Sequence, residues 1–287
     1  MKYLRDEPLK NHTSFRIGGP ADYFCVPKSK AELKEALAFA KLNKLGLFVL
    51  GAGSNVLISD EGFRGLVVKL ADGPSAVEVK DQTVVAGAGV LLSKLLKILA
   101  QKELSGLEFL AGVPGSLGGA VVMNLGAWEE SIGQYVLRVT CVERDGLERT
   151  LTHAELDFGY RHSILQRGNL FVVGIELKLK PGSKPEIEAQ INKNIKARQG
   201  NQPLEFPSAG SVFKNPPNEY AWKLIDAAGC KGLKVGQAQL SAKHTNFIVN
   251  LGAATAQDVQ ELICQIQAKV KDRFDIMLEP EIKIMVN

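Results

Sequence analysis

The run GVPGSLGGA, residues 112–120, constrains the architecture of this chain more than any other segment. It holds four glycines and one proline in nine residues, a composition that packs a hydrophobic core poorly. Bare backbone of this kind lets a flat or elongated ligand lie directly against the main chain. Taken alone, this run could equally be a glycine-rich loop that binds no ligand. Two other small-residue runs in the sequence therefore bear on its interpretation.

A second small-residue run, GAGSN at residues 51–55, lies upstream and follows a short apolar stretch that predicts a strand. Small residues allow the backbone to approach an anion, and Ser54 and Asn55 add hydrogen-bond donors. The dinucleotide-binding pattern G-x-G-x-x-G would need glycine where the chain has Val56, and no Gly-Lys-Ser/Thr follows as in a P-loop. The run is therefore either a phosphate site or a tight turn.

A third run, PSAGSVFKNP at residues 207–216, lies far downstream. It places the hydroxyl of Ser211 beside a backbone made pliable by Gly210, and a cation and an amide follow within four residues. This composition disfavours the interior of a helix or a strand and predicts a loop that binds a ligand. Taken by itself, a serine after glycine is more often a turn residue than a catalytic group.

The composition is that of a soluble globular protein. The chain has 287 residues, 45% hydrophobic and 23% charged, which is enough for one large domain or two ordinary ones. A net charge of +4 suits an anionic substrate and does not indicate nucleic acid. The 4 cysteines lack a C-x-x-C pair, which is typical of reduced core thiols in a cytoplasmic protein, and the 4 histidines lack metal-ligand spacing, so no metal site is expected. No signal-peptide core and no long apolar run occurs, so no membrane segment is expected.

Helix and strand patterns follow one another without the strict alternation of a doubly wound sheet, which predicts an α+β fold. Helices are expected at 29–45 with Ser29 as N-cap, at 93–102, at 186–199, at 218–229 with Asn218 as N-cap, and at 255–274 with Thr255 as N-cap. Strands are expected at 47–50, 66–70, 76–79, 83–86, 135–143, 148–152, 170–179, 246–250 and 276–285, with Asp145-Gly146 as a hairpin turn.

Six motifs occur in a fixed order along nearly the whole chain. They are NHTSFRIGGPA (11–21), GAGSNVLISD (51–60), AGVPGSLGGAVVMNLGA (111–127), FGYRHS (158–163), AGSVFKNP (209–216) and LEPEI (278–282). In this order they resemble the UDP-N-acetylenolpyruvoylglucosamine reductase family. Any one of these motifs is a weak signal, whereas six in order are highly specific.

The resemblance implies a flavin-binding fold of the vanillyl-alcohol-oxidase (PCMH) type in two α+β subdomains, followed by a C-terminal α+β substrate-binding domain. On this basis residues 1–182 form the FAD-binding region, with subdomains at about 1–70 and 71–182, and residues 183–287 form the substrate domain. The linker candidate is the turn-rich segment PGSKP at 181–185.

The resemblance also implies an enzyme of peptidoglycan precursor synthesis that reduces UDP-N-acetylglucosamine enolpyruvate to UDP-N-acetylmuramate. NADPH is then the co-substrate, and FAD carries the hydride. Neither glycine run contains a His or Cys that could tether the flavin, so FAD is expected to bind non-covalently. The chain is expected to act as a cytoplasmic monomer, with neither nucleic acid nor a membrane as partner.

Three residues match the family's catalytic groups. Ser211 matches the proton donor, and an isolated hydroxyl needs a polarising neighbour or a water for this task. Arg161 matches the arginine that binds the substrate carboxylate. A guanidinium suits this role because it is permanently charged and can donate two hydrogen bonds to one carboxylate. Glu281 matches the acidic member, which polarises the carboxylate or orients a water, although Glu279 would share its strand face.

The other site residues are expected around the cofactor and the sugar nucleotide. FAD contacts are expected at Gly51, Ala52, Gly53, Ser54, Asn55, Val56, Val113, Pro114, Gly115, Ser116, Gly119 and Ala120. Substrate contacts are expected at Asn215 and Lys214, with Lys243 and His244 as weaker phosphate candidates. Only the short segment 164–169 separates the Arg161 motif from the next strand, so the chain resembles the family type that lacks an inserted tyrosine segment.

Two other functions remain open at this level. One is a different FAD-linked oxidoreductase of the same fold that acts on a sugar or a hydroxy acid, which would not need Ser211, Arg161 and Glu281 together. The other is a non-catalytic protein that binds flavin or a nucleotide sugar. The presence of all three catalytic candidates favours the reductase.

Overall fold

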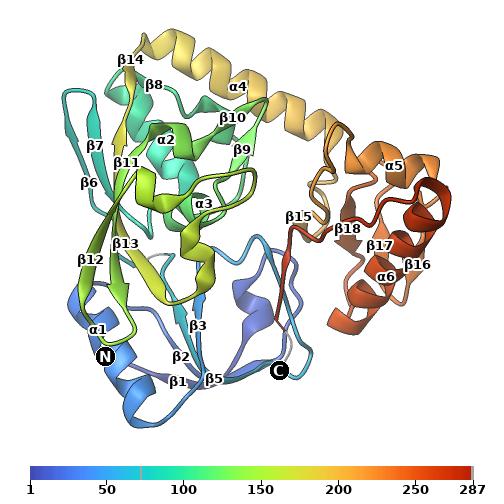
Figure 1. Cartoon of the computed structure of the whole chain (residues 1–287), viewed down its shortest axis with the longest axis horizontal. Helices are drawn as coiled ribbons and strands as arrows, with labels where there is room; N and C mark the ends of the chain where they lie inside the picture. The colour runs from blue at the N-terminus through green and yellow to red at the C-terminus, as the bar shows by residue number, and fades with distance from the viewer. Residues whose placement is uncertain (72, 286–287) are drawn as a thin grey trace. The chain divides into compact units, whose positions relative to one another are not determined.

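The computed structural model describes residues 1–71 and 73–285, which form two compact units (Figure 1). Unit 1 contains Met1–Leu4, Tyr23–Ala52 and Gly65–Arg198, and unit 2 contains Arg5–Asp22, Gly53–Arg64 and the chain from Gln199 onward. Strands β2 (Pro20–Cys25) and β5 (Phe63–Lys69) contribute residues to both units. Each unit combines helices with mainly antiparallel strands, which confirms the predicted α+β class.

The helices are α1 (Lys30–Leu42), α2 (Leu92–Gln101), α3 (Leu117–Val122), α4 (Lys184–Asn201), α5 (Ala221–Ala227) and α6 (Ala256–Phe274). The other strands up to residue 131 are β1 (Leu4–Pro8), β3 (Leu47–Leu50), β4 (Val56–Ile58), β6 (Val77–Lys80), β7 (Thr83–Gly87), β8 (Leu104–Ser105), β9 (Gly126–Ala127) and β10 (Glu130–Ser131). The later strands are β11 (Val136–Glu143), β12 (Glu148–Thr152), β13 (Leu170–Lys178), β14 (Lys180–Pro181), β15 (Ser208–Ser211), β16 (Lys234–Val235), β17 (Ala238–Leu240), β18 (Phe247–Asn250) and β19 (Lys283–Met285).

Unit 1 is built on an antiparallel sheet of order β12-β11-β13-β7-β6. Helices α2 and α3 pack on one face of it, in a core that includes Leu95, Leu117 and Ile175 (Figure 1). Helix α1 packs on the other face, where Leu33 shares a core with Phe171. The predicted hairpin is confirmed, since β11 and β12 pair on either side of Asp145-Gly146.

The two glycine runs of the sequence emerge from regular elements of this scaffold. Strand β3 pairs in parallel with β5, and the run 51–55 begins directly after it. The run 112–120 ends inside a helix that was not predicted, because Ser116 caps α3 by accepting a hydrogen bond from Gly119 N at 3.4 Å. Part of the expected loop is therefore a helix N-terminus.

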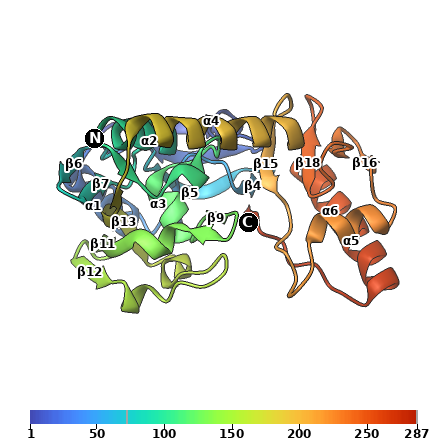
Figure 2. The ribbon, with the colours of Figure 1, turned by 90° about the horizontal axis from the view of Figure 1, so that it is seen from above.

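Unit 2 is built on a four-stranded antiparallel sheet of order β15-β18-β17-β16. Helix α6 packs on this sheet through Val259, Leu262 and Ile266, and Figures 1 and 2 both place α5 beside α6. The predicted cap of α6 is confirmed as a complete capping box between Thr255 and Asp258.

Three local predictions in unit 2 are wrong. The PSAGSVFKNP segment is not all loop, because Ser208–Ser211 forms the edge strand β15, with irregular pairing around Gly210. Asn218 does not cap α5: its φ is +62°, and the first-turn amide of Ala221 donates instead to Asn215 Oδ1 at 3.1 Å. The expected strand 276–285 is a strand only at β19, because the segment before it pairs with a different part of the chain.

Asn250 joins the N-terminal motif to the sheet of unit 2. Its side chain is 2% exposed, donates to Phe15 O at 3.0 Å and accepts from Gly252 N and Ala254 N at 2.8 and 3.0 Å. The motif at 11–21 is therefore anchored to β18 from the far end of the sequence.

Replacing Asn250 with alanine is expected to destabilise the protein by about 2–4 kcal/mol, because it removes the partners of a buried carbonyl, a buried amide and a partly buried amide. Urea unfolding followed by circular dichroism measures this loss. The exposed Asn43 makes one side-chain bond, to Phe39 O, so Asn43→Ala is the control and should cost less than about 1 kcal/mol. Equal losses in the two variants would contradict the anchoring role.

Candidate functional site

The two upstream glycine runs meet in unit 1 at Gly51 and Ser116, which are more than sixty positions apart in the sequence. A β-carbon on Gly51 would lie 2.9 Å from Ser116 Oγ and 3.9 Å from Gly119 Cα. Gly51, the first predicted FAD residue of the upstream run, therefore lies at the end of β3 beside Ser116 and Gly119 at the start of α3.

Protein packing explains one glycine of the second run but not its neighbour. A β-carbon on Gly118 would lie 2.8 Å from the Ala88 β-carbon, so the fold itself excludes a side chain there. A β-carbon on Gly119 would meet only Ser116 Oγ, at 3.4 Å. The missing side chain at Gly119 therefore leaves room that the protein does not fill, which fits a ligand lying against this turn.

The run 51–55 offers a row of backbone donors. Among the described residues, the amides of Ala52, Gly53 and Ser54 donate to no protein acceptor. Gly53 has a φ of +70°, and a β-carbon there would overlap the carbonyl of His12. Successive open amides in a turn form a concave anion site, so this segment fits the pyrophosphate of a dinucleotide such as FAD.

The N-terminal motif supports this run in unit 2. Ser14 N donates to Gly53 O at 3.0 Å, and Ser14 Oγ donates to Ser208 O at 2.7 Å. One residue therefore connects the turn at Gly53 to strand β15, which ends at Ser211.

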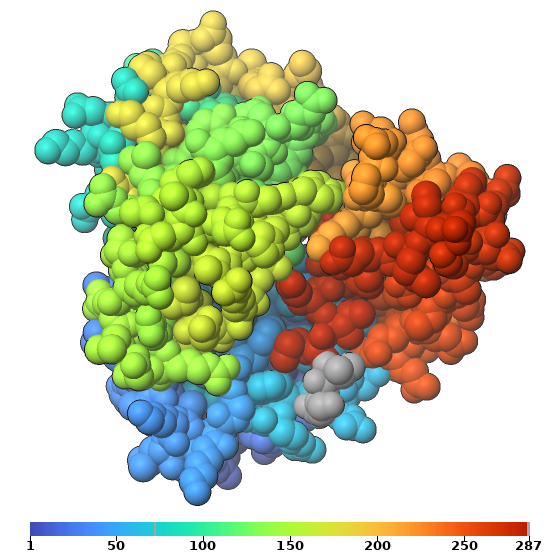
Figure 3. All heavy atoms as spheres, in the orientation of Figure 1, coloured from blue at the N-terminus to red at the C-terminus, as the bar shows by residue number. Residues whose placement is uncertain are grey.

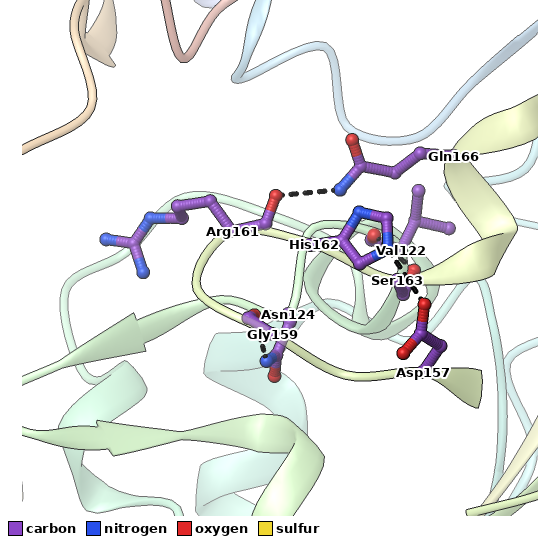
Figure 4. A network of polar contacts seen from close by, with 8 residues as sticks. All are labelled: Val122, Asn124, Asp157, Gly159, Arg161, His162, Ser163 and Gln166. Carbon is purple, nitrogen blue, oxygen red and sulfur yellow. Dashed lines mark hydrogen bonds and ion pairs between the residues drawn. The ribbon is translucent and has the colours of Figure 1, made fainter. Parts of the chain in front are cut away.

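Arg161 lies in a tightly fixed loop of unit 1 (Figure 4). Asn124 Nδ2 donates to Gly159 O at 2.7 Å, and Ser163 Oγ donates to Val122 O at 2.6 Å, so the loop is held against the end of α3. Gln166 Nε2 donates to Arg161 O at 2.9 Å. Figure 4 shows that the guanidinium of Arg161 extends away from this network while its backbone is held.

The backbone of Arg161 has a φ of +51°, a conformation that costs a non-glycine residue of order 1 kcal/mol. Its guanidinium lies 5.2 Å from the ring centre of Tyr160, which is 56% exposed. In the space-filling view of Figure 3, the yellow-green part of the chain that includes this loop lies at the surface of unit 1. A strained but fixed backbone that presents a cation at the surface is typical of a ligand-binding residue.

Ser211 and Glu281 are brought together within unit 2. Glu281 N donates to Val212 O at 2.7 Å, so the residues after β15 pair with the segment that carries Glu281. Within the described part of the chain, Ser211 Oγ forms no hydrogen bond, and a β-carbon on the adjacent Gly210 would meet nothing within 4 Å. The hydroxyl is therefore available to a ligand on a strand edge with open space beside it.

Asn246 positions this strand, and the sequence did not indicate it. Its side chain is 4% exposed; Oδ1 accepts from Phe213 N at 2.9 Å and Nδ2 donates to Phe213 O at 2.8 Å. Its carbonyl accepts from Val212 N at 2.8 Å. An amide that pairs with a backbone unit in this way fixes the chain directly after Ser211, but only three-dimensional proximity reveals it.

The predicted substrate residues all lie in unit 2, with different partners. Lys214 Nζ lies 2.6 Å from Glu279 Oε1, and Asn215 Oδ1 caps α5. Lys243 Nζ donates to Gln199 O at 2.7 Å on an exposed surface. Lys214 and Asn215 directly follow the strand of Ser211, whereas Lys243 lies in the loop before Asn246.

His244 is held inside this loop as a hydrogen-bond acceptor. Its Nδ1 accepts from Asn246 N at 3.3 Å, and its ring packs edge-on to Phe247 with ring centres 4.8 Å apart. Burial lowers the pKa of His244, so the ring is neutral at pH 7 and brings no charge to a phosphate. Its position supports a structural role around Asn246.

Residues 1–71 and 73–285 contain no group of three or more His, Cys, Asp or Glu side chains that could hold a metal ion. No helix in this part of the chain has the length and hydropathy needed to cross a membrane.

In comparisons with known proteins, two family models match separate parts of this chain. Residues 21–152 match the family model described as an FAD binding domain, and residues 202–285 match that of the UDP-N-acetylenolpyruvoylglucosamine reductase C-terminal domain. The reductase of that name from Moorella thermoacetica is 45% identical over 99% of this chain and 93% of its own length. This chain belongs to the UDP-N-acetylenolpyruvoylglucosamine reductase family.

A structural relative gives the same result. The crystal structure of the reductase from Thermus caldophilus is 38% identical, covers 99% of this chain and 98% of its own, and superposes with a TM-score of 0.85. The family membership and the FAD-binding fold expected from the six motifs are thus confirmed. Arg161 falls between the two matched domains, whereas both glycine runs lie in the first and Ser211 and Glu281 in the second.

Replacing Gly119 with alanine is expected to weaken FAD binding at least tenfold while leaving the apo-protein folded. The protein itself has room for the methyl group, and alanine in a helix is favoured over glycine by about 0.5–1 kcal/mol. Titration of apo-protein with FAD, followed by flavin fluorescence, measures the affinity. Gly200 lies in α4 with nothing within 4 Å of an added β-carbon, so Gly200→Ala is the matched control and should bind FAD normally. Normal binding by Gly119→Ala would exclude this turn from the flavin site.

Acidification is expected to destabilise the protein through His244. Because its folded pKa lies below the ordinary histidine value of about 6.5, its stabilising contribution is complete above that value and is lost as the pH falls below it. In His244→Asn an amide oxygen replaces Nδ1 without titrating, so the fall in melting temperature with acidification should be shallower than in the wild type. His162 is exposed, and His162→Asn should keep the wild-type slope. Equal slopes in all three proteins would refute this role.

Proposed function

We propose that this chain reduces UDP-N-acetylglucosamine enolpyruvate to UDP-N-acetylmuramate with NADPH, and that Ser211, Arg161 and Glu281 carry the reaction. The observation that supports the site most directly is the backbone hydrogen bond from Glu281 N to the carbonyl of Val212, the residue after Ser211, in unit 2. Family membership supports the substrate and the cofactor. The reaction adds a hydride to the terminal alkene carbon and a proton to its neighbour, which converts the enolpyruvyl ether into a lactyl ether.

FAD fits the residues that the two glycine runs provide, and when bound it supplies hydride transfer from NADPH to the substrate. The open amides of residues 52–54 bind the pyrophosphate, with Gly51, Asn55 and Val56 flanking them. The rest of the dinucleotide lies against the second run, through Val113, Pro114, Gly115, Ser116, Gly119 and Ala120. None of these residues can form a covalent bond to the flavin.

The proton comes from Ser211. Negative charge builds up on the substrate carbon next to the carboxylate, and this carbon must be protonated from one side. The hydroxyl at the strand edge has no protein partner among the described residues, so it is available to donate. Glu281, on the paired segment, polarises the substrate carboxylate or orients a water.

Arg161 binds the carboxylate of the substrate and stabilises the charge that spreads onto it. A guanidinium keeps its charge throughout and offers two parallel donors to the two carboxylate oxygens. Lys214 and Asn215 bind the sugar nucleotide, and Lys243 adds a positive charge for its phosphates. His244 is neutral and serves the loop rather than the phosphates.

The protein is proposed to work as a cytoplasmic monomer that binds neither nucleic acid nor membranes. The cysteines are consistent with a reducing compartment, because Cys25, Cys141 and Cys230 are buried and form no disulfide. Burial also raises the pKa of Cys25 and of Cys141 to about 12. The small net charge of +4 gives no strong attraction to polyanions.

Ser211→Ala is expected to leave flavin reduction by NADPH intact and to slow reoxidation by UDP-N-acetylglucosamine enolpyruvate by about 10²–10⁴-fold, the range typical of a lost general acid. Anaerobic stopped-flow measurements of visible flavin absorbance separate the two half-reactions.

Ser208→Ala removes a hydroxyl from the same strand and should preserve both half-reactions. A purified protein without flavin would overturn the proposed function. Unchanged reoxidation in Ser211→Ala would instead exclude only Ser211 as the acid.

A further inference from the structure

Arg198, near the C-terminal end of α4, is tied to the backbone that leads into the second glycine run. Its Nε donates to Ala111 O at 2.9 Å and its Nη2 donates to Phe109 O at 3.0 Å. A β-carbon on Gly112 would lie 3.0 Å from Arg198 Cδ, so the arginine stem packs directly on the start of the run. The position of this guanidinium is therefore fixed by the main chain of unit 1.

The positive charge of Arg198 is not balanced by the protein. In the part of the chain that the structure describes, no carboxylate pairs with Arg198; its partners are two carbonyls and the ring of Trp128, whose centre lies 4.7 Å away. Burial and the nearby charge of Arg161 both lower the pKa of Arg198. A partly buried cation is usually paired with an anion, so this one is consistent with an anionic ligand.

Both arginines are anchored to one short stretch of unit 1. The Arg161 loop is hydrogen-bonded to Val122 O and to Asn124, and Arg198 stacks on Trp128, four residues further on. Asn124 and Trp128 have φ values of +42° and +52°, so this stretch is itself held in an uncommon conformation. Two guanidiniums brought together in this way repel each other unless an anion lies between them.

We propose that Arg198 and Arg161 form a two-guanidinium site for the enolpyruvyl carboxylate of the substrate, a proposal that rests on the proposed function. Each guanidinium offers a planar pair of donors, and a carboxylate has two oxygens with free lone pairs for them. The open amides of residues 52–54 are assigned to the pyrophosphate of FAD, and Lys214 and Lys243 of unit 2 to the sugar nucleotide, so the carboxylate is the anion assigned to this pair. Arg198 is the rigid member, because two of its donors are committed to the main chain.

The test compares two ligands of the FAD-loaded, full-length protein by calorimetry: UDP-N-acetylmuramate, which has the carboxylate, and UDP-N-acetylglucosamine, which lacks it. Arg198→Gln should weaken the first about 10- to 100-fold, as expected for lost hydrogen bonds to a charged group, and should change the second less than about twofold. Arg198→Lys keeps the charge but loses the planar fork, so it should weaken the first ligand less than Arg198→Gln does.

Asn194→Ala is the matched control. Asn194 also lies on α4 and donates to Glu108 O at 2.7 Å, so this variant loosens the same backbone without removing a charge, and it should weaken neither ligand selectively. If Arg198→Gln fails to retain FAD, the ratio of the two affinities in Arg198→Lys decides the question. An unchanged ratio, or a ratio that Asn194→Ala reproduces, overturns the proposal.

A second source of negative charge is the reduced flavin. If the arginine variants lower the flavin reduction potential but keep the wild-type preference for the carboxylate ligand, Arg198 serves the flavin and the carboxylate proposal is overturned. If the wild-type protein does not turn over the enolpyruvyl substrate and does not prefer the carboxylate ligand, the proposed function itself is wrong, and the two-guanidinium site is rejected with it. Turnover with a normal preference in Arg198→Gln would reject only the two-guanidinium site.

Discussion

The close approach of Gly51 to Ser116 is the contact on which the cofactor half of this protein depends. It joins the end of a parallel strand to the cap of a short helix, and it leaves no room for a side chain at position 51. The turn that follows Gly51 then has consecutive amides pointing at no protein acceptor. Unpaired amides are costly when they are buried, so such a turn is stable when an anion fills it.

Much of the framework could be read from local patterns. The β11–β12 hairpin follows from Asp145-Gly146 between two alternating segments, and the capping box of α6 follows from Thr255 and Asp258, because these signals lie within a few residues of one another. Asn218 failed as a cap because a residue three positions upstream, Asn215, reaches the same helix end. When the capping residue lies on the far side of a turn, its distance in sequence from the helix is not fixed, so the sequence pattern does not reveal it.

The residues of the candidate site, too, were only partly predictable from the sequence. The family motifs identified Ser211 and Glu281, and the structure explains their proximity through backbone pairing of two segments about seventy residues apart. Asn246 and Arg198 escaped prediction because each acts on a main-chain segment that is distant in sequence. A lone buried amide and a lone arginine carry no local signal, and only the contacts reveal what they hold.

Unit 2 is assembled from three separate stretches of the chain, and this has a consequence for biosynthesis. Strand β4, at residues 56–58, finds its parallel partner only at residues 283–285, so the pair cannot form until all the residues between them have been translated. Pairings of such large sequence separation form slowly because a long loop must close first. The segment with Glu281 lies immediately before β19, so a nascent chain acquires its acidic catalytic candidate and the last strand of the fold almost simultaneously. A chain whose synthesis stops before residue 281 would lack both.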